Sequence, residues 1–216
     1  MFEVPVKYLY AVLGWVLWCT LHSALISIKV TEYTKKRLGD RFRFYRLFYN
    51  ALSLGTLVPL LYYSSSIRTV PVFQWKGLLL IFKYVLLATS IYLFISAGRR
   101  YSISQFLGIR QIKTGRVNQA LSEGNDIDTS GIMGLIRHPW YLAGIMIVWA
   151  GDLSLSTVVI NIVISTYFII GAFLEERKLV LEFGDQYRKY QKDVSMLVPY
   201  KWLKARIAGM HSLQRN

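Results

Sequence analysis

Long apolar stretches alternate along this chain with shorter segments that are rich in Lys and Arg. A helix needs roughly 20 apolar residues to cross a bilayer, and five stretches approach or exceed that length. They cover residues 4–28, 44–63, 75–97, 139–150 and 155–174. The last two are separated by a few residues around Gly151, so they predict a helical hairpin. The pattern therefore predicts an all-α, polytopic integral membrane bundle of about five transmembrane helices.

Apolar and aromatic residues recur at helical spacing after the fifth stretch, from Leu174 to Val194, with basic residues between them. This pattern predicts one amphipathic C-terminal helix on the membrane surface. We expect a single membrane domain over residues 1–216. Its parts are three N-terminal spans (1–98), a cytoplasmic loop (99–130), the hairpin with the C-terminal helix (131–200) and a basic tail (201–216). The long loop lies directly before the hairpin, so we expect it to cover an active site.

The charged residues are strongly basic, with 26 Lys and Arg against 12 Asp and Glu, in a chain that is 54% hydrophobic. Such apolar composition is typical of a membrane protein. In a soluble protein the excess of cations would indicate nucleic acid. Here the cations lie between the apolar stretches, which favours a bilayer with anionic headgroups as the partner and no nucleic acid.

The basic residues also predict orientation. Segments 29–46, 99–137 and 177–215 hold 22 of the 26 Lys and Arg, whereas the alternate loops hold only Arg68 and Lys76. Basic loops stay in the cytoplasm. We therefore expect the N-terminus outside and the C-terminus in the cytoplasm, in a bacterial inner membrane.

Several kinds of site are disfavoured by the residues present. The single cysteine, Cys19, excludes an intramolecular disulfide and a multi-thiolate metal site. The three histidines, His22, His138 and His211, are far apart in sequence and lack helical pairing, so we expect no metal. No glycine-rich dinucleotide motif follows a strand pattern, which disfavours a soluble-type nucleotide fold.

A cation pair and a carboxylate pair flank the predicted hairpin. Arg137 and His138 precede its first helix, and Glu175 and Glu176 follow its second. A hairpin brings both pairs to the same membrane face, where ionisable groups are costly and therefore commonly functional. The alternative is structural, because Arg137 could flank the membrane and Pro139 could simply begin a helix.

The order and spacing of these residues resemble those of a known superfamily. The pattern is Arg-His-Pro-x-Tyr-x-x-Gly at 137–144, Glu-Glu-x-x-Leu at 175–179 and Phe-Gly-x-x-Tyr-x-x-Tyr at 183–190. It resembles the isoprenylcysteine carboxyl methyltransferase superfamily of integral-membrane, S-adenosylmethionine-dependent methyltransferases, over residues 131–199. Three further segments, 21–27, 45–50 and 105–108, are similar to the branch that contains NnrU-like proteins and methanethiol S-methyltransferases.

The resemblance implies S-adenosylmethionine as the cofactor, bound on the cytoplasmic side. Arg137 and His138 would donate to the cofactor carboxylate, helped by the helix start at Pro139. Carboxylates and aromatic rings would hold its ammonium, ribose and sulfonium groups. The candidate cofactor-binding residues are Arg137, His138, Pro139, Tyr141, Gly144, Glu175, Glu176 and Tyr187. The candidate catalytic residues are His22, Glu175 and Glu176.

His22 lies toward the cytoplasmic end of the first apolar stretch, beside Ser23. An ionisable group inside a membrane segment is a functional candidate, here as a base for a thiol. A histidine that is satisfied by helix packing is an equally good interpretation. We also expect Arg137 at the membrane face and outside the core. One of the two glutamates should face the cofactor, for example Glu175, while Glu176 braces Arg137 or the C-terminal helix. A one-residue rotation at the end of the fifth stretch would exchange these two roles.

The most consistent function is S-methylation of a small or lipophilic thiol such as methanethiol. Three alternatives stay open at this point. They are carboxyl-O- or amine-N-methylation of a prenylated or lipid acceptor, an NADPH-dependent sterol-type reduction, and a non-enzymatic role in membrane assembly.

The charge distribution makes a prediction about topology. A reporter that is active only in the cytoplasm, fused after Asn216, should be active, because the basic segments resist translocation. The same reporter inserted after Asp152, between the fourth and fifth stretches, should be inactive. Activity limited to the Asp152 fusion would contradict the orientation.

Overall fold

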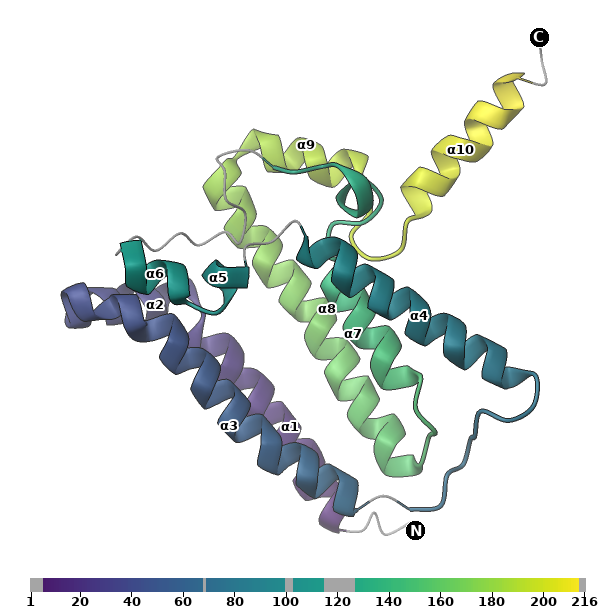
Figure 1. The fold of residues 1–216 in the computed structure, drawn as a ribbon, viewed down its shortest axis with the longest axis horizontal. Coiled ribbons are helices and arrows are strands. Elements are labelled where there is room, and N and C mark those ends of the chain that lie inside the picture. Colours follow the sequence, from purple (N-terminus) through teal and green to yellow (C-terminus); the bar gives the residue numbers. More distant parts are fainter. Residues whose placement is uncertain (1–5, 68, 100–102, 115–126, 214–216) are drawn as a thin grey trace.

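The computed structural model describes residues 6–67, 69–99, 103–114 and 127–213, and its regular elements are helices (Figure 1). They are α1 (Val6–Leu25), α2 (Ile28–Leu38), η1 (Gly39–Phe44), α3 (Tyr45–Ser66), α4 (Leu79–Gly98), α5 (Ile103–Phe106), α6 (Ile109–Thr114), η2 (Gly131–Gly134), α7 (Pro139–Trp149), α8 (Leu155–Phe183), α9 (Asp185–Asp193) and α10 (Tyr200–Leu213). Within these ranges there is no strand, only two isolated bridges, Phe73 with Leu153 and Ile136 with Ser195. The prediction of an all-α membrane bundle is confirmed.

Each of the five apolar stretches forms a helix, namely α1, α3, α4, α7 and α8. Among the described residues, α1, α4 and α8 are long and apolar enough to cross a membrane. Helix α7 is apolar but has only 11 residues, and α3 has 22 residues with a more polar composition. The protein is therefore an integral membrane protein, whereas the count of five crossings stays a prediction.

The long helices form two groups that meet along α1 and α8. Helices α1 and α3 run side by side in opposite directions, and α7 lies against both α4 and α8 (Figure 1). Buried Trp15 and Ile160 belong to the apolar cluster that joins α1 to α8. Leu93 and Ala143 belong to a second cluster between α4 and α7. Ends of helices that are distant in sequence are thus brought together at one end of the bundle.

The α7–α8 hairpin is held by polar contacts at its turn. Ser154 caps α8 by accepting a hydrogen bond from the Thr157 backbone at 3.2 Å, and the Asn161 side chain donates to the Val148 carbonyl at 2.8 Å. The predicted hairpin with its turn near Gly151 is confirmed. The turn directs α8 back along α7, which returns Glu175 and Glu176 to the level where α7 begins.

The prediction of one continuous amphipathic helix up to Val194 is wrong. Helix α8 ends at Phe183, and Gly184 adopts φ +54° and ψ −127°, a backbone conformation that suits glycine. The chain bends there, and α9 lies across the end of the hairpin (Figure 1). Its buried Tyr187 and Tyr190 pack with Leu179, Val180 and Phe183 of α8. Apolar spacing on both sides of Gly184 reflects this packing, and not a single membrane-surface helix.

The loop that we expect to cover an active site falls partly outside the described residues, at 100–102 and 115–126. In its described part, the side chain of Asn50 on α3 donates a hydrogen bond to the Phe106 carbonyl at 3.0 Å. This contact ties α5 to the end of α3. The covering role stays a prediction.

Close packing of α7 on α8 predicts that Gly144 tolerates no side chain. A Cβ atom at Gly144 would lie 2.7 Å from Cε2 of Phe168, whereas a Cβ at Gly55 on α3 would meet nothing within 4 Å. Gly144→Ala should therefore lower the free energy of unfolding by about 1–3 kcal/mol. Gly55→Ala, the matched control, should leave it unchanged or slightly raised. Thermal unfolding of both variants in detergent measures the difference, and equal midpoints would contradict the packing.

Candidate active site

The segment that follows α9 positions the start of α7. The backbone N–H groups of Arg137 and His138 donate to the carbonyls of Ser195 and Met196 at 2.9 and 3.1 Å. Pro139 is the first residue of α7, where its missing N–H costs nothing. The Arg-His-Pro sequence thus forms a short bridge to residues 195–196 before the helix begins. This bridge directs both the Arg137 and the His138 side chain toward α8.

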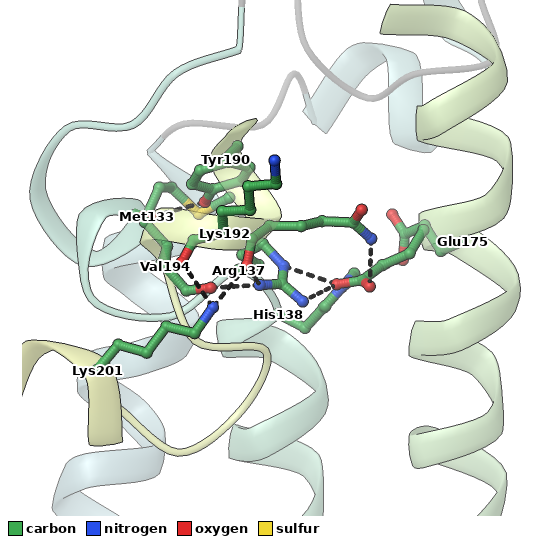
Figure 2. Close-up of polar contacts among 10 residues, drawn as sticks. Met133, Arg137, His138, Glu175, Tyr190, Lys192, Val194 and Lys201 are labelled. Carbon is green, nitrogen blue, oxygen red and sulfur yellow. Dashed lines mark hydrogen bonds and ion pairs between the residues drawn. The ribbon is translucent and has the colours of Figure 1, made fainter. Parts of the chain in front are cut away.

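Arg137 joins three helices through one buried guanidinium (Figure 2). Its Nε donates to Glu176 Oε1 at 2.7 Å, and its Nη2 lies 2.5 Å from the same oxygen. Its Nη1 donates to the carbonyls of Gln191, at 3.1 Å, and Val194, at the end of α9. Only 7% of the side chain is exposed. The expectation that Arg137 lies outside the core is wrong, because α9 folds back over it.

Glu176 is the partner that satisfies this guanidinium. One carboxylate oxygen faces Arg137 and also lies 3.2 Å from His138 Nε2, and the other accepts a hydrogen bond from Gln191 Nε2 at 2.7 Å. The side chain is 9% exposed. Both oxygens are engaged, as a buried carboxylate requires. Of the two glutamates, Glu176 is therefore the one that contacts Arg137 and α9.

Glu175 differs from its neighbour in exposure. Its side chain is 32% exposed, and its Oε2 lies 3.7 Å from His138 Nδ1, too long for a hydrogen bond. Arg46 of α3 and Lys178 of α8 are close enough to interact electrostatically with it. Lys178 also donates to the Ile26 carbonyl beyond the end of α1, at 2.7 Å. We refer to Arg137, His138, Glu175 and Glu176 as the ion-pair cluster.

Arg46 and Lys178 carry no site prediction from the sequence, where they count only toward orientation. Lys178 lies one turn after Glu175, and this i, i+3 spacing is a signal that could have indicated it. Arg46 has no such signal, since its proximity to Glu175 depends on how α3 packs in the bundle. Together they add two cations from two helices to the exposed side of the ion-pair cluster.

Two buried tyrosines of α9, Tyr187 and Tyr190, lie next to the ion-pair cluster. Burial raises the pKa of Tyr187, and the negative charge of Glu176 raises it further. Burial likewise raises the pKa of Tyr190, whose hydroxyl donates to the Met133 carbonyl at 2.6 Å. Both phenols therefore stay neutral at physiological pH. The ring of Tyr141 lies beside the cluster, 5.4 Å from that of His138.

The structure thus brings together most of the residues that the sequence singles out. Arg137, His138, Glu175, Glu176 and Tyr187 meet at one end of the bundle, with Tyr141 next to them. Gly144 lies deeper, against Phe168, and Pro139 serves as a helix start. His22 lies on α1, outside the ion-pair cluster, in contact with Tyr49 of α3. The functional roles of all these residues stay predictions.

The buried Arg137–Glu176 pair makes a prediction about stability. Arg137→Met should lower the free energy of unfolding by about 3–5 kcal/mol, because it leaves Glu176 buried without its partner. The double variant Arg137→Met, Glu176→Leu should lose much less than the sum of the two single variants. Arg188→Met is the control, because the Arg188–Asp185 pair is exposed and its loss should have no measurable effect. Additive losses in denaturant unfolding would contradict the coupling.

Comparison with known proteins points to one family. Residues 10–199 match the NnrU protein family. The chain is 41% identical over 66 residues to a methanethiol S-methyltransferase of Pseudomonas deceptionensis, which covers 30% of this chain and 25% of that protein. Methanethiol S-methyltransferase 1 of Bradyrhizobium diazoefficiens is 40% identical over 67 residues, covering 31% and 24%. One from Mycobacterium tuberculosis is 35% identical over 66 residues, covering 30% and 27%.

The matched part of the chain thus spans about a quarter of the length of these curated relatives. No solved structure matches the chain. The family match, in contrast, covers most of the chain, from the first transmembrane helix to the segment after α9. The protein belongs to the NnrU family.

Proposed function

We propose that this protein is an S-adenosylmethionine-dependent methyltransferase that methylates a small or lipophilic thiol in the membrane. The observation that carries the proposal is the ion-pair cluster, where Glu175 stays accessible beside a buried, fully paired Glu176. The similarity to methanethiol S-methyltransferases supports the reaction class.

The charges around Glu175 suit a cofactor that carries both a carboxylate and an ammonium group. Glu175 offers an accessible acceptor for an ammonium or for ribose hydroxyls. Arg46, Lys178 and His138 lie near it and offer donors for a carboxylate. Arg137 and Glu176 neutralise each other, so the two remaining cations exceed the one remaining carboxylate. The two cations can hold the single carboxylate of the amino-acid moiety while Glu175 faces its ammonium group.

The roles of the two arginines differ in this proposal. The Nε, Nη1 and Nη2 atoms of Arg137 already contact Glu176, Gln191 and Val194. We therefore assign Arg137 to positioning α9 and Glu176, and we assign direct contact with the cofactor carboxylate to Arg46 and Lys178.

S-Adenosylmethionine, when bound, supplies an electrophilic methyl group on a sulfonium. The protein's own contribution is to exclude water and to orient the reactants, since charge is neutralised in this reaction and water would oppose it. The rings of Tyr141 and Tyr187, with the helices around them, provide an aromatic and apolar surrounding for that step. Electron-rich ring faces also stabilise a sulfonium.

Two glutamine variants test the assignment of the carboxylates. Glu175→Gln should weaken S-adenosylmethionine binding by about 1.5–3 kcal/mol, the contribution of a charged hydrogen bond, with little change in thermal stability. Glu176→Gln should act mainly through stability, because it removes a charge from a buried pair. Calorimetry and labelled methyl transfer to ethanethiol, with the detergent-purified protein, measure both effects.

The unmodified protein provides the control, with NADPH as the competing ligand. Binding of NADPH in place of S-adenosylmethionine, or of neither, would contradict the proposed function. Full affinity and activity in both glutamine variants would contradict the site.

A further inference from the structure

A second polar cluster lies inside the bundle between α1, α3 and α8, and the proposed cofactor site does not use it. Its centre is His22, which contacts the hydroxyls of Tyr49 and Ser53. The indole of Trp18 stacks on the imidazole at 4.8 Å, and Tyr167 of α8 approaches it edge-on at 6.1 Å. Ionisable groups inside a membrane bundle are energetically costly, so they commonly mark a functional site.

Helix pairing alone does not require this cluster. Other side chains already join α1 to α3, since Trp15 donates to Ser64 at 2.9 Å and Trp18 donates to Thr56 at 3.1 Å. These are neutral pairs that hold helices together at lower cost. An imidazole adds a ring nitrogen that can accept a proton and another that can donate one.

Two hydroxyl groups contact the ring nitrogens of His22. The Tyr49 hydroxyl lies 2.5 Å from Nε2 and 3.0 Å from Nδ1, and the Ser53 hydroxyl lies 3.1 Å from Nδ1. A tautomer with its hydrogen on Nδ1 would donate to Ser53 and leave Nε2 to accept from Tyr49. Other titratable groups nearby are Tyr167 on α8 and Cys19, which lies one turn before His22 on α1, and Arg46 lies one turn before Tyr49.

This cluster is connected to the proposed cofactor site by a row of aromatic rings. Successive ring centroids are 6.1, 6.0, 5.8 and 5.4 Å apart along His22, Tyr167, Phe168, Tyr141 and His138. Tyr167, Gly171 and Glu175 also share one face of α8, about 12 Å from first to last. At Gly171, a Cβ atom would lie 3.3 Å from Cε1 of Tyr141, so a larger residue would require this ring to shift.

We propose that Tyr49, His22 and Ser53 form a proton relay that deprotonates a small, neutral thiol bound between α1, α3 and α8. The inference rests on the proposed function and identifies its acceptor side. Tyr49 touches the substrate, His22 stores the proton, and Ser53 is a positioning residue that selects the tautomer.

The thiol gives its proton to the Tyr49 oxygen while the Tyr49 hydroxyl proton moves to His22 Nε2. The thiol sulfur uses its freed electron pair to bond the methyl carbon, and the bond from that carbon to the sulfonium sulfur breaks, leaving its electron pair on that sulfur. The positive charge of the sulfonium is lost and that of the imidazolium appears.

The side chains around the relay determine which thiols can bind there. Indole and phenol rings and apolar helices surround the imidazole, so a charged thiol such as an amino acid would lose its hydration without compensation. A small neutral alkyl thiol can reach the relay through the membrane and has a proton to remove. We therefore expect turnover of ethanethiol and none of cysteine.

Two thiols of different acidity test the relay. Both thiols can enter the site in their neutral form, but ethanethiol holds its proton tightly and needs a base, whereas thiophenol is more acidic and loses its proton far more readily. Tyr49→Phe and His22→Gln should lower turnover of ethanethiol by about 10²-fold or more and that of thiophenol far less. Tyr63→Phe is the matched control, because Tyr63 lies on the same helix and its hydroxyl binds the Lys7 carbonyl instead. It should leave both rates unchanged.

Binding without the cofactor gives an independent readout. Ethanethiol should quench the fluorescence of Trp18, which stacks on His22, in the cofactor-free protein. The quenching should disappear in Trp18→Phe and weaken in His22→Gln. S-Adenosylmethionine affinity, measured by calorimetry, should be unchanged in the Tyr49 and His22 variants.

The outcomes separate this proposal from the proposed function. Equal losses for both thiols, or no loss for either, would overturn the relay while the methyltransferase function stands. Lost cofactor affinity in the relay variants would overturn its assignment to the acceptor side. A wild-type protein that neither binds S-adenosylmethionine nor methylates either thiol would overturn the proposed function and the relay together. If His22→Gln fails to fold, Tyr49→Phe, which keeps the ring, carries the test alone.

Discussion

The ion pair between Arg137 and Glu176 is the interaction on which this end of the molecule depends. A guanidinium and a carboxylate that are each less than a tenth exposed must satisfy one another or destabilise the fold. Here the remaining donors and acceptors are met by His138, by Gln191 and by the carbonyls that end α9. One pair therefore fixes the start of α7, the end of α8 and the position of α9 relative to both.

This constraint also separates the two adjacent glutamates. Successive helical residues point about 100° apart, so only one of them can face the guanidinium. Glu176 takes that place, and Glu175 is turned toward Arg46 and Lys178 at a third of its full exposure. The two adjacent glutamates thus provide one buried carboxylate, which pairs with Arg137, and one accessible carboxylate. The rotation of α8 that produces this difference is set by the apolar contacts of α8 with α1 and α7.

Much of this arrangement could be predicted from the sequence, because membrane helices and their turns are encoded locally. The five apolar helices, the hairpin and the meeting of Arg137 with Glu176 follow from hydrophobic length and from the spacing of charges. The burial of Arg137 does not, since it depends on the bend at Gly184, and a glycine in a helical pattern can also be tolerated without a bend. The proximity of Arg46 to Glu175 and of Tyr49 to His22 depends on the packing of α3, which sequence periodicity alone does not specify.

Helix α8 carries the connection between the two polar clusters. Its residues at positions 167, 171 and 175 lie four apart, so an aromatic ring, a glycine and a carboxylate form one stripe from the interior to the end of the bundle. The ring contacts His22, the glycine admits Tyr141 at close range, and the carboxylate lies next to His138. Because an α-helix is stiff over this distance, a group bound at either end is placed relative to the other by backbone geometry alone. In the proposed reaction, this stripe would fix the distance between the relay at His22 and the cofactor site at the end of α8.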